Sequence, residues 1–83
     1  MNMFHYVYVL QNKEKEISTG YTLNLAWSLE RHNKATATNN GPWKVIYCEA
    51  YPHVSDAVRR AEYLKSIHGT KLIKQRLQRY LWK

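Results

Sequence analysis

The segment ISTGYTLNLAWSLERHN, residues 17–33, decides the fold of this chain. It begins with a short run of alternating apolar and polar residues that Gly20 closes, and a Tyr-Thr pair follows. Asn24 stands where the N-cap of a helix is expected, ahead of the imperfectly helical stretch Leu25–Asn33. This order predicts a strand that leads through a turn into a helix, which is a common way to aim side chains into a cleft.

The stretches around this segment predict two more strands. HYVYVLQN (His5–Asn12) is rich in Tyr and Val, and its nearly continuous apolar character is typical of a central strand. The charged turn Lys13–Glu16 contains no glycine and joins this strand to residues 16–22 as a hairpin. WKVIYCEAY (Trp43–Tyr51) is the third strand, and the small polar residues of Lys34–Pro42 before it predict a mobile loop.

The last third of the chain has the pattern of two helices. Ser55 is the expected cap of a helix over Asp56–His68. Its apolar stripe consists of Ala57, Ala61 and Leu64. Gly69 stands where a helix commonly stops in the left-handed conformation, and Thr70 is the expected cap of a final helix over Lys71–Trp82. The predicted fold class is therefore α+β, with a three-stranded antiparallel sheet flanked by three helices in the order β-β-α-β-α-α.

Length and composition predict a single small domain over residues 1–83. The chain is 45% hydrophobic and 23% charged, and no apolar run approaches the roughly 18 residues that span a bilayer. The N-terminus lacks the basic start and the small-residue cleavage site of a signal peptide. The lone cysteine, Cys48, excludes an internal disulfide and fits a reducing compartment. We therefore expect a soluble cytoplasmic protein without membrane contact.

The charge of the chain is uneven. The formal net charge is +7, and the part from Pro52 onward carries +6 of it, because it holds eight basic and two acidic side chains. The basic side chains expected to contact a polyanion are Arg59, Arg60, Lys65, Lys71, Lys74, Arg76 and Arg79. A localised positive field attracts nucleic acid first, since Lys and Arg neutralise phosphates and release counterions. The plainer alternative is a solvated helical surface that keeps the protein soluble.

Several short motifs, taken together in their order along the chain, carry a resemblance to a known family. They are YVYVL at 6–10, STGYT at 18–22, His32-Asn33, Pro-Trp-Lys at 42–44 and Tyr-Leu-Lys at 63–65. In this order the chain resembles a GIY-YIG nuclease domain. It is most similar to the small stand-alone proteins related to the N-terminal domain of the UvrC DNA-repair nuclease. The resemblance runs from Tyr6 to Leu81.

The resemblance implies DNA cleavage with one Mg²⁺ or Mn²⁺ ion. In the family, two tyrosines line the cleft, an arginine of the first helix stabilises the phosphate charge, and a glutamate of the second helix holds the metal. This division of labour is physically sound, because phosphodiester cleavage builds charge on oxygens that a metal and a guanidinium can stabilise. A hard divalent cation also prefers carboxylate oxygen.

Only part of that machinery is carried over to this chain. The first tyrosine falls on Tyr8 and the histidine of the first helix on His32. The second tyrosine falls on Ser18, the arginine on Ser28 and the metal-holding glutamate on Ala61. By resemblance, therefore, three positions have lost the family's chemistry.

Two neighbouring residues are candidates to compensate. Arg31 lies three residues after Ser28 and shares a helix face with it. Glu62 is adjacent to Ala61, but one helical step turns a side chain by about 100°. Glu62 becomes the metal ligand only if the alignment of this helix is shifted by one residue.

Three hypotheses remain open from the sequence. The first is a catalytically impaired nuclease-like domain that binds nucleic acid, DNA above all, through its basic C-terminal face. The second is an active Mg²⁺- or Mn²⁺-dependent endonuclease that uses Tyr8, His32, Arg31 and Glu62. The third is a protein-interaction module, with a protein partner docked on Trp27 and the vacated cleft.

Overall fold

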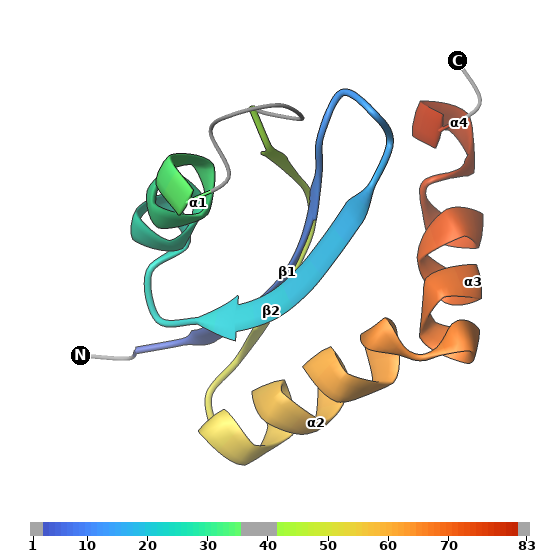
Figure 1. Ribbon diagram of the computed structural model, residues 1–83. Helices are drawn as coiled ribbons and strands as arrows, with labels where there is room; N and C mark the ends of the chain where they lie inside the picture. Colours follow the sequence, from blue (N-terminus) through green and yellow to red (C-terminus); the bar gives the residue numbers. More distant parts are fainter. Residues whose placement is uncertain (1–2, 36–41, 82–83) are drawn as a thin grey trace.

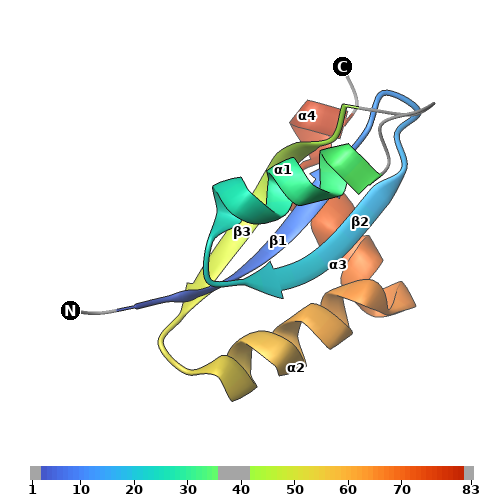
Figure 2. The ribbon, with the colours of Figure 1, turned by 60° about the vertical axis from the view of Figure 1, so that its left-hand side comes forward.

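A three-stranded antiparallel sheet forms the centre of the computed structural model, which describes residues 3–35 and 42–81. The strands are β1 (His5–Gln11), β2 (Ile17–Thr22) and β3 (Lys44–Tyr51), and the helices are α1 (Leu25–Ala35), α2 (Val54–Lys65), α3 (Ile67–Arg76) and α4 (Gln78–Leu81). The strand order is β2-β1-β3, so β1 is central as its apolar sequence predicts. Figures 1 and 2 show α1 on one side of the sheet and α2 and α3 on the other. The predicted α+β fold is confirmed.

The hairpin between β1 and β2 closes without glycine because the Asn12 side chain hydrogen-bonds to backbone groups of the turn. Its side-chain oxygen accepts from the backbone N–H of Glu14 and of Glu16, at 3.0 and 2.9 Å. Its side-chain nitrogen donates to the Glu16 carboxylate at 2.8 Å. Lys15 adopts a positive φ of 68° in this turn. Asn12 is accordingly buried although it is polar.

The hydrophobic core lies between the sheet and the helices α2 and α3. It consists of Val7 and Val9 from β1 together with Ala57, Ala61, Leu64 and Ile73. The α2 members are the stripe that the sequence predicts, at helical spacing. Val7 and Val9 alternate with Tyr6 and Tyr8 along β1, so the tyrosines point to the α1 side of the sheet.

The predicted start of α2 is wrong by two residues. His53, not Ser55, is the N-cap, and its Nδ1 accepts a hydrogen bond from the backbone N–H of Ser55 at 3.1 Å. Both residues carry a side-chain acceptor, and the turn after Pro52 places the imidazole at the open end of the helix. The predicted cap at Asn24 is confirmed, because its Oδ1 accepts from the N–H of Trp27 at 3.0 Å.

The predicted break between the last helices is also wrong in position. Ser66 ends α2 and caps α3, and its hydroxyl accepts from the N–H of Gly69 at 3.2 Å. Gly69 is a buried residue inside α3 rather than a left-handed terminator, and Thr70 is the next residue of the same helix. A Cβ at Gly69 would lie 2.0 Å from the carbonyl oxygen of Tyr63. Glycine is therefore required by the close approach of α3 to the end of α2.

Two further boundaries differ from the prediction. The single helix expected from Lys71 to Trp82 is divided at Leu77 into α3 and α4, and Trp82 lies outside the described residues. The expected loop begins later than Lys34, because α1 continues to Ala35, and residues 36–41 of that loop lie outside the described residues. None of the helices in the described ranges is long and apolar enough to cross a membrane.

Candidate functional site

Tyr8, the first of the predicted site residues, lies at the centre of the sheet. It lies directly opposite Gly20 on β2 and Cys48 on β3, in the middle of the sheet. Its phenol ring covers the glycine, since a Cβ on Gly20 would lie 2.5 Å from the Tyr8 hydroxyl oxygen. Burial raises the pKa of the Tyr8 hydroxyl above its ordinary value of 10.0. A hydroxyl in this environment is protonated at neutral pH.

By resemblance, Ser18 and Ser28 stand where the family's second tyrosine and its arginine are expected. Ser18 pairs with Leu10, two residues before Gly20, so its side chain points to the same side of the sheet as Tyr8. Ser28 lies on α1, and its hydroxyl is 2.6 Å from the hydroxyl of Thr22 at the end of β2. This hydrogen bond holds the first turn of α1 against the sheet. It places no charge near Tyr8.

His32 and Asn33 hold the far end of α1 to the start of β3. The rings of His32 and Trp43 meet edge to face, with their centres 4.7 Å apart. The Asn33 side chain accepts from the backbone N–H of Trp43 at 2.6 Å and donates to its carbonyl at 3.2 Å. These contacts give His32 a packing role.

Arg31 is directed toward Trp27 on the exposed side of α1. Its guanidinium carbon lies 4.9 Å from the centre of the Trp27 ring, and 56% of Trp27 is exposed. Glu30 and Lys34 line the same shallow hollow of about 460 Å³ and pair with each other at 3.1 Å. The structure thus joins Arg31 to Trp27, and no contact joins it to Tyr8 in the part of the chain that is described.

Ala61 is separated from Tyr8 by the sheet. It is 2% exposed and packs in the core with Val7 and Val9, whose side chains point away from the Tyr8 side. Its neighbour Glu62 is exposed on the outer side of α2. The structure therefore brings Tyr8 and Ser18 to one side of the sheet and position 61 to the other.

The described side chains do not gather into a site that would hold a divalent metal by several protein ligands. Within residues 3–35 and 42–81, no group of three or more His, Cys, Asp and Glu side chains is placed to hold an ion. A hard cation needs several oxygen ligands, and the position where the resemblance leads us to expect a carboxylate is the buried Ala61.

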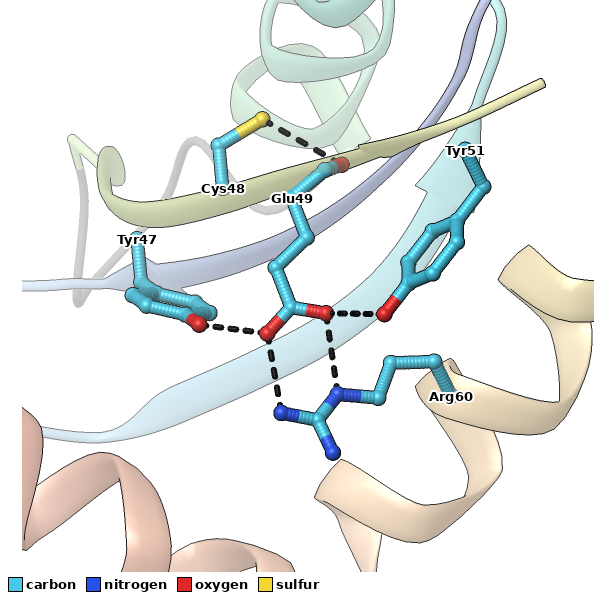
Figure 3. A network of polar contacts seen from close by, with 5 residues as sticks. All are labelled: Tyr47, Cys48, Glu49, Tyr51 and Arg60. Atoms are coloured by element: carbon cyan, nitrogen blue, oxygen red, sulfur yellow. Dashed lines mark hydrogen bonds and ion pairs between the residues drawn. The ribbon is translucent and has the colours of Figure 1, made fainter.

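A polar cluster that the family motifs do not predict surrounds Glu49 on β3 (Figure 3). Arg60 of α2 grips the carboxylate with two hydrogen bonds, from Nε at 2.9 Å and from a terminal nitrogen at 3.0 Å. The hydroxyls of Tyr47 and Tyr51 donate to the two carboxylate oxygens. Glu49 and Arg60 have side chains that are only 17% and 25% exposed. All four bonds converge on one carboxylate, and the two from Arg60 tie β3 to α2.

These donors control the ionisation of Glu49. Burial alone would raise the pKa of its carboxyl, but the hydrogen bonds from Arg60, Tyr47 and Tyr51 outweigh burial and lower the pKa from 4.5 to about 2. The same contacts raise the pKa of Arg60. Because the Glu49 oxygens already accept four hydrogen bonds, this carboxylate is committed to the fold. The spacing of Tyr47, Glu49 and Tyr51 on one side of a strand is the sequence signal that could have revealed the cluster.

The predicted nucleic-acid-binding side chains differ in their availability. Arg60 is engaged with Glu49, and Arg59 lies 3.9 Å from Asp56 in an exposed pair. The remaining five are exposed on α2, α3 and α4, and they are Lys65, Lys71, Lys74, Arg76 and Arg79. An exposed ion pair such as that of Arg59 is weak, so Arg59 also keeps most of its charge for a partner.

The chain is similar to known proteins over nearly its whole length. The sequence model of the GIY-YIG catalytic domain matches residues 4–74. A UPF0213 protein of Staphylococcus haemolyticus is 32% identical, over 84% of this chain and 90% of that protein. A UPF0213 protein of Oceanobacillus iheyensis is 30% identical, over 81% of this chain and 83% of that protein. The solution NMR structure of a UPF0213 protein from Bacillus halodurans aligns with a TM-score of 0.57 at 25% identity, covering 88% of this chain and 84% of that one.

Proposed function

The chain belongs to the GIY-YIG catalytic domain family and to its UPF0213 group, and from this membership we propose that it binds nucleic acid without cleaving it efficiently. The nuclease-like scaffold is retained, from the Tyr8–Gly20 pair on the sheet to His32-Asn33 on α1. What differs is the set of side chains that the family uses for chemistry.

The burial of Ala61 carries this proposal. By resemblance this position holds the metal, and here it is a methyl group packed in the core. Ser18 and Ser28 stand where a tyrosine and an arginine are expected, and Ser28 is hydrogen-bonded to Thr22. Without a carboxylate and a guanidinium beside the scissile phosphate, the developing negative charge is not stabilised. Mg²⁺ and Mn²⁺ therefore have no part in the proposed function.

Binding is supported by the exposed basic side chains of the C-terminal helices. α3 and α4 carry four of them, Lys71, Lys74, Arg76 and Arg79. They contain no acidic residue, so their field is not cancelled locally. Such a surface binds phosphates through counterion release, and its affinity falls steeply with salt. By resemblance, the expected setting is DNA repair in the cytoplasm, with DNA as the nucleic acid.

The experiment combines binding and cleavage on the same labelled substrates. Anisotropy of single-stranded, duplex and branched DNA is measured between 50 and 200 mM salt, the range over which phosphate contacts change affinity by about 10³ or more. Cleavage of the same substrates is followed with Mg²⁺, with Mn²⁺ and with EDTA. We expect salt-sensitive binding and no metal-dependent product.

Two results would contradict the proposal. Cleavage that EDTA abolishes and that is also lost in Glu62→Ala would make Glu62 a functional ligand and the chain an active endonuclease. Absence of binding at 50 mM salt would leave a protein partner, docked near the exposed Trp27, as the better hypothesis.

A further inference from the structure

Two hollows meet where the closed end of the β1–β2 hairpin lies beside α4. Each has a volume of about 400 Å³. Both are lined by Gln11, Lys15 and Leu81, so they adjoin at these residues. Both views of the ribbon place α4 next to this end of the hairpin (Figures 1 and 2). We call the joined hollows the hairpin groove.

Lysine dominates the charge of the hairpin groove. Four lysines line it, and they are Lys13, Lys15, Lys44 and Lys74. They come from the hairpin turn, from β3 and from α3, so the fold gathers charges that are far apart in the sequence. No acidic residue lines either hollow in the described part of the chain. The carboxylate of Glu16, in the same turn, accepts a hydrogen bond from Asn12.

Two polar features of the groove point to a ligand. The ammonium group of Lys44 lies 5.2 Å from the centre of the Tyr80 ring, and both residues line the first hollow. Gln11 is only 6% exposed. It lines both hollows, beside the lysines.

We propose that the hairpin groove holds consecutive phosphodiester groups of the bound nucleic acid. Lys13, Lys15, Lys44 and Lys74 neutralise the phosphates, and the Gln11 amide donates to an oxygen of the backbone. Four point charges spread over two joined, open hollows fit an extended polyanion better than a single small anion. Lysines of this kind position a nucleic acid without reading its sequence, so the contact is independent of sequence. This inference rests on the proposed function. It assigns part of the contact with the nucleic-acid phosphates to the hairpin rather than to the outer surface of the helices.

The test compares two variants that each lose two positive charges. Lys15→Asn/Lys44→Gln removes charges from the groove, and asparagine tolerates the positive φ of 68° at position 15. Arg31→Gln/Lys34→Gln removes two exposed charges of α1 that do not line the groove and are not among the proposed binding residues. The affinity for a duplex oligonucleotide is measured as a function of salt. Since each lost phosphate contact flattens the log–log slope by about 0.9, we expect the groove variant to flatten it by about 1.8.

A second measurement uses the unaltered protein. The side-chain NH₂ signal of Gln11 is followed by ¹⁵N NMR during titration with the same oligonucleotide, and we expect it to shift at saturation. A stationary Gln11 signal would overturn the inference. So would a control variant that flattens the slope as much as the groove variant, and in both cases the proposed function would stand. If the parent protein fails to bind at low salt, the inference and the proposed function fall together.

Discussion

The hydroxyl oxygen of Tyr8 lies 2.5 Å from the point that a Cβ on Gly20 would occupy, and the ring carbon bonded to it lies 2.8 Å from that point. The two residues are direct partners across β1 and β2. An aromatic ring that folds over a cross-strand glycine covers backbone that would otherwise be exposed. Gly20 is therefore required by the position of the tyrosine.

Gly20→Ala should cost about 1 kcal/mol of unfolding free energy, because the added methyl displaces the end of the Tyr8 side chain. The loss should largely disappear when the substitution is made in a Tyr8→Ala background. A double-mutant cycle from urea unfolding measures this coupling. Equal losses in both backgrounds would show that the ring does not restrict position 20.

Gly69→Ala should be far more damaging, with an expected loss of about 3 kcal/mol or more. Alanine normally stabilises a helix relative to glycine by about 0.5–1 kcal/mol. Here the new Cβ would meet the Tyr63 carbonyl oxygen at 2.0 Å and the Leu64 Cα at 2.4 Å, and backbone cannot move aside as a side chain can. Thermal unfolding gives the comparison. Gln75→Ala, at an exposed site of the same helix, should stay within about 0.5 kcal/mol of the parent.

Glu49 should make the stability of the protein depend on acid pH. Its pKa is lowered from 4.5 to about 2 in the folded protein, chiefly by the hydrogen bonds from Arg60 and the two tyrosines, which outweigh the opposing effect of burial. A lowering of this size corresponds to about 3 kcal/mol. Because the folded pKa is depressed, the contribution is complete above about pH 4.5. It is lost as the pH falls toward 2.

Glu49→Gln provides the measurement, since glutamine keeps the shape and removes the charge. The difference in unfolding free energy between parent and variant should be largest near pH 6 and should shrink between pH 4.5 and 2. Urea midpoints at pH 6, 4, 3 and 2 follow it. A difference that does not change with pH would show that the carboxylate is not the titrating group.

Substitutions at positions 61 and 62 should have very different effects on the free energy of unfolding. Ala61→Glu places a carboxylate in the core beside Val7 and Val9, and we expect a loss of about 2–4 kcal/mol. Glu62→Ala, at an exposed site, should change stability by less than about 0.5 kcal/mol. Chemical unfolding of both variants gives the result. A stable Ala61→Glu protein would mean that position 61 reaches solvent and is not closed in the core.

The sequence predicts the strands and the core well because both depend on local pattern. The apolar alternation of β1 and the Ala57, Ala61 and Leu64 stripe of α2 are visible without a structure. The caps of the later helices were less predictable, since His53 and Ser55 both offer an acceptor within two residues. The role of Gly69 cannot be predicted locally, because the glycine is required by a contact with the end of α2 that no sequence pattern records.

The candidate site shows the same division. The family motifs point to Tyr8, Ser28 and Ala61 as candidate site positions. They give no indication that the sheet separates Tyr8 from Ala61. The partnership of Glu49 with Arg60 crosses from a strand to a helix, and each residue alone looks like ordinary surface charge. The hairpin groove depends on the packing of α4 against a turn that lies early in the chain.

The central position of β1 has a consequence for the order in which the protein folds. β1 leaves the site of synthesis first, yet its second partner, β3, begins only at Lys44, and the core that covers Val7 and Val9 is completed by Ile73 of α3. Among the strands of the described residues, only the hairpin pairs segments that follow one another in the sequence, and a lone hairpin is marginally stable in water. The domain therefore acquires its cooperative structure only when nearly all of its chain is present. This is the behaviour of a topology rich in contacts between distant residues.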